Sequence, residues 1–305
     1  MVDDSPLVSV AVITYNSSLY VKETLDSILA QTYCNIELVI SDDHSSDDTV
    51  VICHRWITEH EARFSKAFVV ESGTNTGIAM NCQRAVEQCS GEWLKLIAGD
   101  DVMLPGCISD CFEYVSSNSG VYAVFGKMLP FGSKNKMLLE AINSNLDVSF
   151  FSLSIKGQLD YLIHNRNCLP APAAFLNLSK MRDLKISYDV RIPMMEDYPL
   201  WIQFLQNGLK LNFIDKFLVQ YRVGGVSTES GRNLRYYKST RLFRFYYQYP
   251  IWSQCNFEDA INTMVNEECE IYEQLIRVES SKAYKIGRVL IYPFHVLRRL
   301  IYGKQ

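Results

Sequence analysis

The 305-residue sequence lacks a hydrophobic run long enough to cross a membrane. Its longest late apolar stretch, residues 289–297, is interrupted by Pro293 and His295, and a spanning helix needs about 20 consecutive apolar residues. Residues 1–4 contain neither the basic nor the apolar region of a signal peptide. We therefore expect a cytoplasmic protein.

Cysteine is present, but not in a pattern that builds a site. The nine cysteines are an odd number scattered along the chain, which suits a reducing compartment where Cys acts as a small hydrophobe. Cys107 and Cys111 are one helical turn apart, but no second Cys/His pair with zinc spacing accompanies them. The pattern therefore argues against a zinc site.

Three short catalytic signatures are also missing. No Gly-x-Gly-x-x-Gly follows the first predicted strand, and no Gly-Lys-Ser/Thr phosphate loop occurs in the chain. A Gly-x-Ser-x-Gly nucleophile elbow is absent as well. These absences argue against a dinucleotide dehydrogenase, a P-loop enzyme and an elbow-type hydrolase.

The composition is that of an ordinary folded protein, with 48% hydrophobic and 21% charged residues. The net charge of −4 hides an asymmetry, because residues 1–229 carry 18 basic and 27 acidic side chains and residues 230–305 carry 12 and 7. No basic stripe with interleaved aromatics occurs in the first segment. We therefore expect no nucleic-acid partner for it.

Apolar, β-branched runs alternate with helix-spaced segments in the first third of the chain. This alternation predicts an α/β fold with a parallel, doubly wound sheet, whose ligands lie beyond the carboxyl ends of the strands. Strands are expected at residues 8–13, 36–40, 68–70 and 93–98, and helices at about 21–31, 50–57 and 78–88.

Polar residues follow each of these predicted strands. Because parallel strands bring their carboxyl ends to one edge of the sheet, we expect these residues to converge there. The pair Asp100-Asp101 offers hard oxygen ligands for Mg²⁺ or Mn²⁺, shared with the phosphates of a substrate. The alternative is that these acids cap a helix or face water. The polar strand ends are Thr14-Tyr15-Asn16, Asp42-Asp43, Asn75 to Gly77 and Asp100-Asp101.

Several ordered motifs resemble the family 2 glycosyltransferases of GT-A fold over residues 7–228. The resemblance implies a Rossmann-like, mostly parallel sheet flanked by helices, with residues 1–104 as the nucleotide-sugar half and residues 105–228 as the acceptor half. Residues 229–305 would form a helical C-terminal extension. The matching segments are residues 8–16, 31–33, 36–47, 75–77, 91–93, 195–201 and 217–222.

The resemblance also implies a nucleotide-sugar site on the first half. Thr14 and Tyr15 would hold the uracil ring, Asp42 or Asp43 would accept its N3 proton, and Asp101 would bind the divalent cation between the phosphates. Asp100 would contact ribose or metal. The nucleotide-sugar residues would be Thr14, Tyr15, Asn16, Asp42, Asp43, Asn75, Gly77, Asn81 and Asp100.

On the acceptor side, Asp197 is the candidate general base of an inverting transfer, because a carboxylate must take the proton of the attacking hydroxyl. Capping of the following helix by Glu196 and Asp197 is the alternative. Glu196, Tyr198, Trp201 and Arg222 are further acceptor-side candidates.

Two positions depart from the family pattern. Ala98 stands where many relatives have an extra Asp before the acidic pair, and Gly224 stands where many have a His. Fewer metal ligands suggest looser binding of the cation. These departures keep a non-catalytic nucleotide-sugar-binding subunit open as an alternative to an enzyme. A sugar nucleotidyltransferase is the other alternative, although no Gly-rich basic loop follows the first strand.

The extension combines basic and aromatic residues. Residues 232–244 place a cation at every third position among several tyrosines, and residues 282–301 alternate cations with apolar residues. Such segments suit an anionic membrane surface. Packing on the body of the protein or on a second subunit is the alternative.

Taken with the resemblance, these patterns predict an inverting glycosyltransferase that uses a UDP-sugar and Mn²⁺ or Mg²⁺. Its acceptor would be a glycan, on a lipid-pyrophosphate carrier, in surface-polysaccharide (O-antigen or lipopolysaccharide) biosynthesis. The enzyme would be cytoplasmic, with peripheral contact at the membrane through residues 229–305, and homo-oligomer formation is left open.

Overall fold

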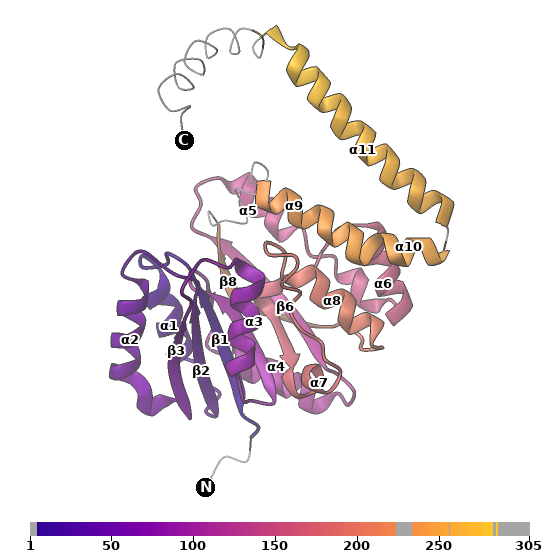
Figure 1. Cartoon of the computed structure of the whole chain (residues 1–305). Coiled ribbons are helices and arrows are strands. Elements are labelled where there is room, and N and C mark those ends of the chain that lie inside the picture. Colours follow the sequence, from indigo (N-terminus) through magenta and orange to yellow (C-terminus); the bar gives the residue numbers. More distant parts are fainter. Residues whose placement is uncertain (1–4, 224–233, 256, 283–284, 286–305) are drawn as a thin grey trace, which may run out of the picture. The chain divides into compact units, whose positions relative to one another are not determined.

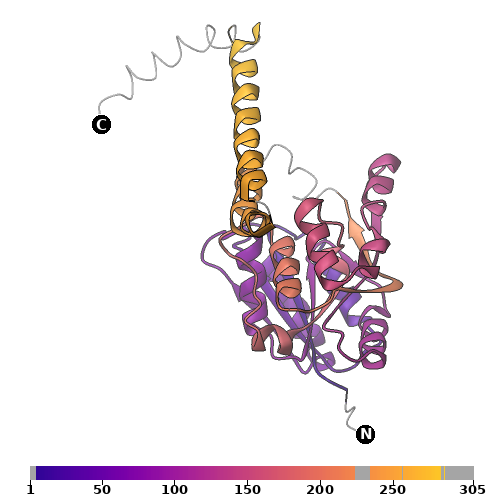
Figure 2. The same ribbon diagram turned by 90° about the vertical axis from the view of Figure 1, so that its right-hand side faces the viewer.

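The computed structural model describes residues 5–223, 234–255, 257–282 and 285. Seen from two sides, the strands of the first compact unit lie between helices (Figures 1 and 2). Up to Ala98 the elements are β1 (Val8–Thr14), α1 (Val21–Leu29), β2 (Ile36–Asp42), α2 (Thr49–His60), β3 (Lys66–Glu71), α3 (Ile78–Gln88) and β4 (Trp93–Ala98).

The order after Ala98 is less regular. It comprises β5 (Val102–Met103), α4 (Cys107–Ser117), β6 (Ala123–Phe131), α5 (Lys136–Asn143), α6 (Ile155–His164), β7 (Ala174–Asn177), α7 (Leu178–Asp183), α8 (Asp197–Gln206), β8 (Asn212–Arg222), α9 (Leu234–Phe243), α10 (Tyr249–Cys255) and α11 (Phe257–Ser280). Short 3-10 turns precede β3, α6 and β7, and a π-helical turn, Arg244–Gln248, follows α9.

The eight strands found among the described residues form one sheet in the order β3-β2-β1-β4-β7-β6-β8-β5. The predicted parallel part is confirmed, because β1 pairs in parallel with β2 and β4, and β2 pairs in parallel with β3. In this register Thr14 lies opposite Asp42 and Ile13 lies opposite Ala98. The polar ends of β1, β2 and β4 therefore meet at one edge.

The second half of the sheet is mixed. Strand β7 runs antiparallel to both β4 and β6, and β5 runs antiparallel to β8, whereas β6 and β8 are parallel. The alternation of strands and helices that predicts parallel pairing ends at β4. β8 then returns to the same edge, where its last residue, Arg222, pairs with Phe131 of β6.

The two faces of the parallel strands are packed differently. Alternate β1 residues Val8, Val10 and Val12 join a cluster with Leu25 of α1 and Trp56 of α2. Helix α3 contacts β1 and β2 and buries small residues on its inner side. These are Ala79, Cys82 and Ala85, which allow the helix axis to approach the sheet closely.

The chain divides into two compact units, residues 1–248 and residues 249–305. The first unit therefore runs beyond the predicted boundary at residue 228, because α9 and the π-turn dock on it. Phe243 stacks on Tyr198 with ring centroids 4.2 Å apart, and Tyr247 donates a 2.8 Å hydrogen bond to Asp189. The second unit contains α10 and the 24-residue α11.

Within the described ranges, no helix is both long and apolar enough to span a membrane. Most of residues 282–301 lies outside the described residues, and so does Gly224; of the second predicted basic cluster only Lys282 and Lys285 are described. The expectation of a membrane-facing amphipathic segment at the end of the chain stays a prediction.

Candidate active site

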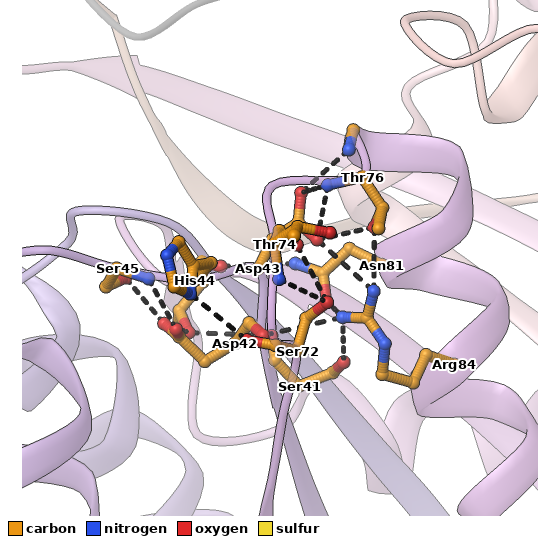
Figure 3. A network of polar contacts seen from close by, with 12 residues as sticks. Ser41, Asp42, Asp43, His44, Ser45, Ser72, Thr74, Thr76, Asn81 and Arg84 are labelled. Carbon is orange, nitrogen blue, oxygen red and sulfur yellow. Dashed lines mark hydrogen bonds and ion pairs between the residues drawn. The ribbon is translucent and has the colours of Figure 1, made fainter.

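Asp42, the last residue of β2, and Asp43, which follows it, organise the predicted nucleotide side of the site (Figure 3). The Asp42 carboxylate is buried and accepts hydrogen bonds from Thr14 Oγ1 (2.7 Å), Ser45 Oγ (2.6 Å) and Ser45 N (2.7 Å). The first two donors reach Oδ2, and only the Ser45 amide reaches Oδ1. Asp42 Oδ1 therefore retains acceptor capacity.

Asp43 is more fully engaged. Its oxygens accept hydrogen bonds from the amides of Thr76 (2.9 and 3.0 Å) and Gly77 (2.7 Å) and from Thr76 Oγ1 (2.6 Å). Arg84 adds an ion pair of 3.2 Å. Asp43 thus fastens the loop before α3 to the end of β2, and of the two acids Asp42 is the one with an unfilled oxygen.

Arg84 belongs to this network, although the sequence motifs did not single it out. Its guanidinium reaches Asp43, Thr76 Oγ1 (2.7 Å) and Asn81 Oδ1 (3.1 Å), and its side chain is only 16% exposed (Figure 3). The signal in the sequence was its place three residues after Asn81, which puts both on one face of a helix. A buried cation here offsets the charge of the buried acids.

Asn81 is buried and bridges α3 to β1. Its amide donates to the Thr14 carbonyl (3.1 Å) while its oxygen accepts from Arg84. Asn75 is half-buried in the loop before α3. The predicted sugar or nucleotide contacts of both residues stay predictions.

The backbone conformation at position 77 requires glycine. Its φ of +94° is a left-handed conformation, and an added Cβ would lie 3.0 Å from the Pro193 carbonyl oxygen. The Ala79 amide donates to the same oxygen at 3.2 Å. The start of α3 therefore lies against the segment that leads into Glu196 and Asp197.

Tyr15 and Asn16 lie at the rim of this edge. The Tyr15 ring is 47% exposed, as a stacking surface for a base would have to be. Asn16 adopts a φ of +51°, and its side-chain oxygen accepts from the Ser46 amide at 2.8 Å. Asn16 thus fixes the loop after β1 against the loop after β2.

Asp100 and Asp101 follow β4 at the same edge. An added Cβ on Gly99 would come within 2.8 Å of Thr14 Cγ2, so only glycine lets the turn approach β1 this closely. Asp101 is buried and accepts the Arg222 backbone N–H at 2.8 Å. Burial, and then the charge of Asp100, raises the pKa of Asp101 to about 8. Burial also raises the pKa of Asp100, against the opposing charge of Arg222.

The Asp100-Asp101 pair is chemically suited to bind a divalent cation. Two neighbouring carboxylates that are costly to ionise together are stabilised by a divalent ion, and their oxygens are the ligands that Mg²⁺ and Mn²⁺ prefer. Among the described residues, no group of three or more His, Cys, Asp or Glu side chains is arranged to hold a metal. The described part of the chain would therefore supply the two acids Asp100 and Asp101, and a bound substrate or water would supply further ligands.

Arg222 holds the pair in place from β8. Its Nε donates to the Asp100 carbonyl at 2.8 Å, and a terminal nitrogen pairs with Glu23. The guanidinium lies between the rings of Tyr20 and Phe131, 4.2 and 4.3 Å from their centroids. Arg222 was predicted on the acceptor side, whereas the structure places its side chain at the acidic pair.

We expect Arg222→Lys to weaken Mn²⁺-dependent binding of UDP by about tenfold, because lysine keeps the charge but loses the planar fork and both ring stacks. Isothermal titration of UDP with and without Mn²⁺ measures this. Arg55→Lys is the matched control, because it makes the same arginine-to-lysine substitution at an exposed position of α2. Unchanged affinity in the Arg222→Lys variant would contradict a positioning role for Arg222.

Glu196 and Asp197 stand at the start of α8, as predicted, and both are half-buried. Asn167 Nδ2 donates to Asp197 Oδ2 at 2.7 Å. Loss of contact with water raises the pKa of both acids, and this burial together with the charge of Asp197 brings the pKa of Glu196 to about 8. Their charges also help to raise the pKa of Cys82 on α3, which places them near the nucleotide half.

Helix α8 itself is buried on most sides. Tyr198 is 8% and Trp201 2% exposed. The Tyr198 hydroxyl donates to the carbonyls of Leu162 and Asn165, and Trp201 packs edge-on against Phe125 at 4.8 Å. Both aromatics support the helix that carries Asp197, and direct contact with an acceptor stays a prediction for them.

The fold and this edge define a class of protein. A mostly parallel half-sheet that gathers an exposed tyrosine ring and several buried carboxylates at the carboxyl ends of its strands is the arrangement expected of a GT-A type transferase. Residues 9–162 match the family Glycosyl transferase family 2, which is half of the chain. The chain therefore belongs to this family and is a glycosyltransferase.

Curated relatives agree with this membership. An uncharacterized glycosyltransferase of Methanocaldococcus jannaschii is 22% identical over 80% of this chain and 78% of its own length. The Escherichia coli protein WfaP, a UDP-Glc:alpha-D-GlcNAc-diphosphoundecaprenol beta-1,3-glucosyltransferase, is 24% identical over 75% of this chain and 82% of its own. TuaG of Bacillus subtilis, a putative teichuronic acid biosynthesis glycosyltransferase, is 24% identical over 76% and 85%.

Solved structures share the fold. S. aureus TarS 1-349 in complex with UDP-GlcNAc has a TM-score of 0.61 and 20% identity, covering 78% of this chain. This chain spans 65% of that TarS chain. The mannosyltransferase PcManGT from Pyrobaculum calidifontis, in complex with GDP-Man and Mn²⁺, has a TM-score of 0.56 and 15% identity over 99% of this chain and 89% of its own.

Proposed function

We propose that the protein transfers a sugar from a UDP-sugar to a hydroxyl group of a glycan acceptor, with inversion at the anomeric carbon. The observation that carries the proposal is the convergence of Asp42, Asp101 and Asp197 from three separate parts of the chain. The β1–β2–β4 register brings the first two to one sheet edge. The hydrogen bond from the Ala79 amide to the Pro193 carbonyl ties α3 to the segment before Glu196, and this supports including Asp197 in the same site.

Each residue has a task in this transfer. The Tyr15 ring stacks on uracil, and the unfilled Asp42 Oδ1 accepts the uracil N3 proton. Asp100 and Asp101 hold Mn²⁺ or Mg²⁺, which stabilises negative charge on the departing UDP when bound. Asp197 removes the proton from the attacking hydroxyl. An inverting transfer needs no covalent intermediate, so no nucleophilic side chain is required.

The biological setting is proposed from the relatives. WfaP transfers glucose from UDP-Glc to an alpha-D-GlcNAc-diphosphoundecaprenol acceptor, and TuaG is a putative teichuronic acid biosynthesis glycosyltransferase. A lipid-pyrophosphate-linked glycan in surface-polysaccharide synthesis is therefore the acceptor class that we propose.

Incubation with a panel of UDP- and GDP-sugars and Mn²⁺, with detection of the released nucleoside diphosphate, tests the donor. We expect UDP release with one UDP-sugar and little with GDP-sugars. Release of pyrophosphate from UTP and a sugar phosphate would instead identify a nucleotidyltransferase. UDP binding without turnover of any donor and acceptor would favour a non-catalytic binding subunit.

Peripheral membrane contact gives a further prediction. Residues 276–305 carry seven basic residues and one acidic residue, so the protein should co-sediment with phosphatidylglycerol vesicles and dissociate as salt screens the charges. Neutral phosphatidylcholine vesicles are the control. Equal sedimentation after deletion of residues 276–305 would remove this role.

A further inference from the structure

A pocket of about 330 Å³ opens in the acceptor half of the first unit, apart from the nucleotide edge. None of the predicted nucleotide-sugar residues lines it. Its walls come from β6, β8, the end of α5 with the segment after it, and the loop before β7. The described lining residues are Lys127, Met128, Ile142, Asn145, Leu146, Val148, Asn167, Cys168, Leu169, Pro170 and Phe217.

The lining combines apolar walls with a few polar groups. Apolar residues form most of it, Phe217 is 47% exposed and adds an aromatic face, and Asn145 and Asn167 add amides. A pyranose ring has the matching chemistry, with apolar C–H faces and hydroxyl groups at its edge that donate and accept hydrogen bonds. A cavity left by imperfect packing of the core would differ from this pocket, because it would be closed to solvent and lined by carbon atoms alone.

The charge of the lining favours a neutral occupant. Lys127 is the one charged residue among the described lining residues, and its ammonium is paired with Asp215 and lies 5.6 Å from the Phe217 ring centroid. A phosphate or a uronate would have to compete with Asp215 for this cation. The pocket therefore suits an uncharged saccharide better than an anionic one.

Asn167 connects the pocket to the candidate base. It lines the pocket, its Nδ2 donates to Asp197 Oδ2 at 2.7 Å, and its Oδ1 accepts the Leu169 amide at 3.1 Å. The amide nitrogen carries a second hydrogen that these bonds leave available. A group in the pocket is thus one side chain away from Asp197.

We propose that this pocket binds a neutral sugar residue of the acceptor and so sets which glycan presents its hydroxyl to Asp197. The proposal rests on the proposed function, since it takes Asp197 as the base. It adds a specificity site that is built from β6, β8 and residues 142–148 and 167–170 and is separate from the donor.

Val148→Trp tests the pocket. Val148 is 47% exposed at its wall, so an indole should fill the space without disturbing the core. Val51→Trp makes the same exchange at a 65% exposed valine of α2, outside the pocket. Ligand-observed NMR with methyl glycosides of neutral hexoses and N-acetylhexosamines reads binding without a donor, and methyl glucuronide and glucose 6-phosphate are the anionic probes.

We expect the wild type and Val51→Trp to bind a neutral glycoside, and Val148→Trp to bind it about tenfold more weakly, a change of about 1.4 kcal/mol. UDP affinity should stay within about twofold in all three proteins, which separates this site from the donor. No glycoside binding by the wild type, preferential binding of the anionic probes, or equal binding by both tryptophan variants would overturn the proposal. Failure of the wild type to bind UDP would overturn the proposed function. Glycoside binding is measured without UDP, so its result does not depend on that outcome.

Discussion

Asp101→Asn should abolish the Mn²⁺-dependent part of UDP binding while the protein stays folded. The substitution removes one of the two charges that would hold the cation, and asparagine keeps an oxygen that can accept the Arg222 N–H. Burial and the charge of Asp100 raise the pKa of Asp101 to about 8. The ionised carboxylate therefore destabilises the folded protein when no metal is bound. Loss of that charge should leave the unfolding temperature unchanged or raise it.

Titration of UDP with Mn²⁺ and with EDTA measures the expected change. The wild type should bind more tightly with the metal, and the variant should bind with the weak EDTA affinity in both conditions. Asp183→Asn, at an exposed acid at the end of α7, is the matched control. Full transfer activity of the Asp101→Asn variant at saturating Mn²⁺ would remove the metal assignment.

The nucleotide edge could be predicted because its signal is local. Each strand of the first half is a short, mostly apolar run that is followed by polar residues, and parallel pairing alone then brings Thr14 opposite Asp42. The antiparallel β7 could not be predicted in this way. It is four residues long and is held between β4 and β6 by pairing with segments distant in sequence.

The contacts of Arg84 and Arg222 could not be predicted for the same physical reason. Arg84 stands in an ordinary amphipathic helix, and only the fold shows that it meets Asp43, which is 41 residues earlier. Arg222 belongs to a sequence motif. Its contacts with the rings of Tyr20 and Phe131, however, depend on three segments that are distant in the sequence. Sequence patterns indicate which strand end a residue occupies. Tertiary packing decides which partner it meets there.

The boundary of the extension shows the same effect. A run of cations and tyrosines after residue 230 suggested a separate surface segment, and α9 does expose Leu234 and Tyr237. Its other side, however, buries Phe243 against Tyr198 and so becomes part of the first unit. The helix therefore supports α8, and through it Asp197.

Asp197→Asn should be the most damaging substitution for the chemical step. Asparagine keeps the shape of the side chain and can still accept the 2.7 Å hydrogen bond from Asn167, but it cannot take a proton. Transfer should therefore fall by about 10² to 10⁴, the usual contribution of a general base, while UDP-sugar affinity stays within about threefold. Steady-state kinetics together with donor titration separate the two quantities.

The pH dependence gives the same residue a second test. Burial raises the pKa of Asp197 and, with the charge of Asp197, that of Glu196 to about 8. A raised pKa means that the base is still protonated at a pH where an ordinary carboxylate is ionised, so wild-type kcat should stay low to a higher pH than it would with an ordinary carboxylate base, and then increase. Glu196→Gln is the matched control, because it removes the neighbouring acid and leaves Asp197 in place. A near-normal rate for Asp197→Asn with an inactive Glu196→Gln would assign the base to Glu196 instead.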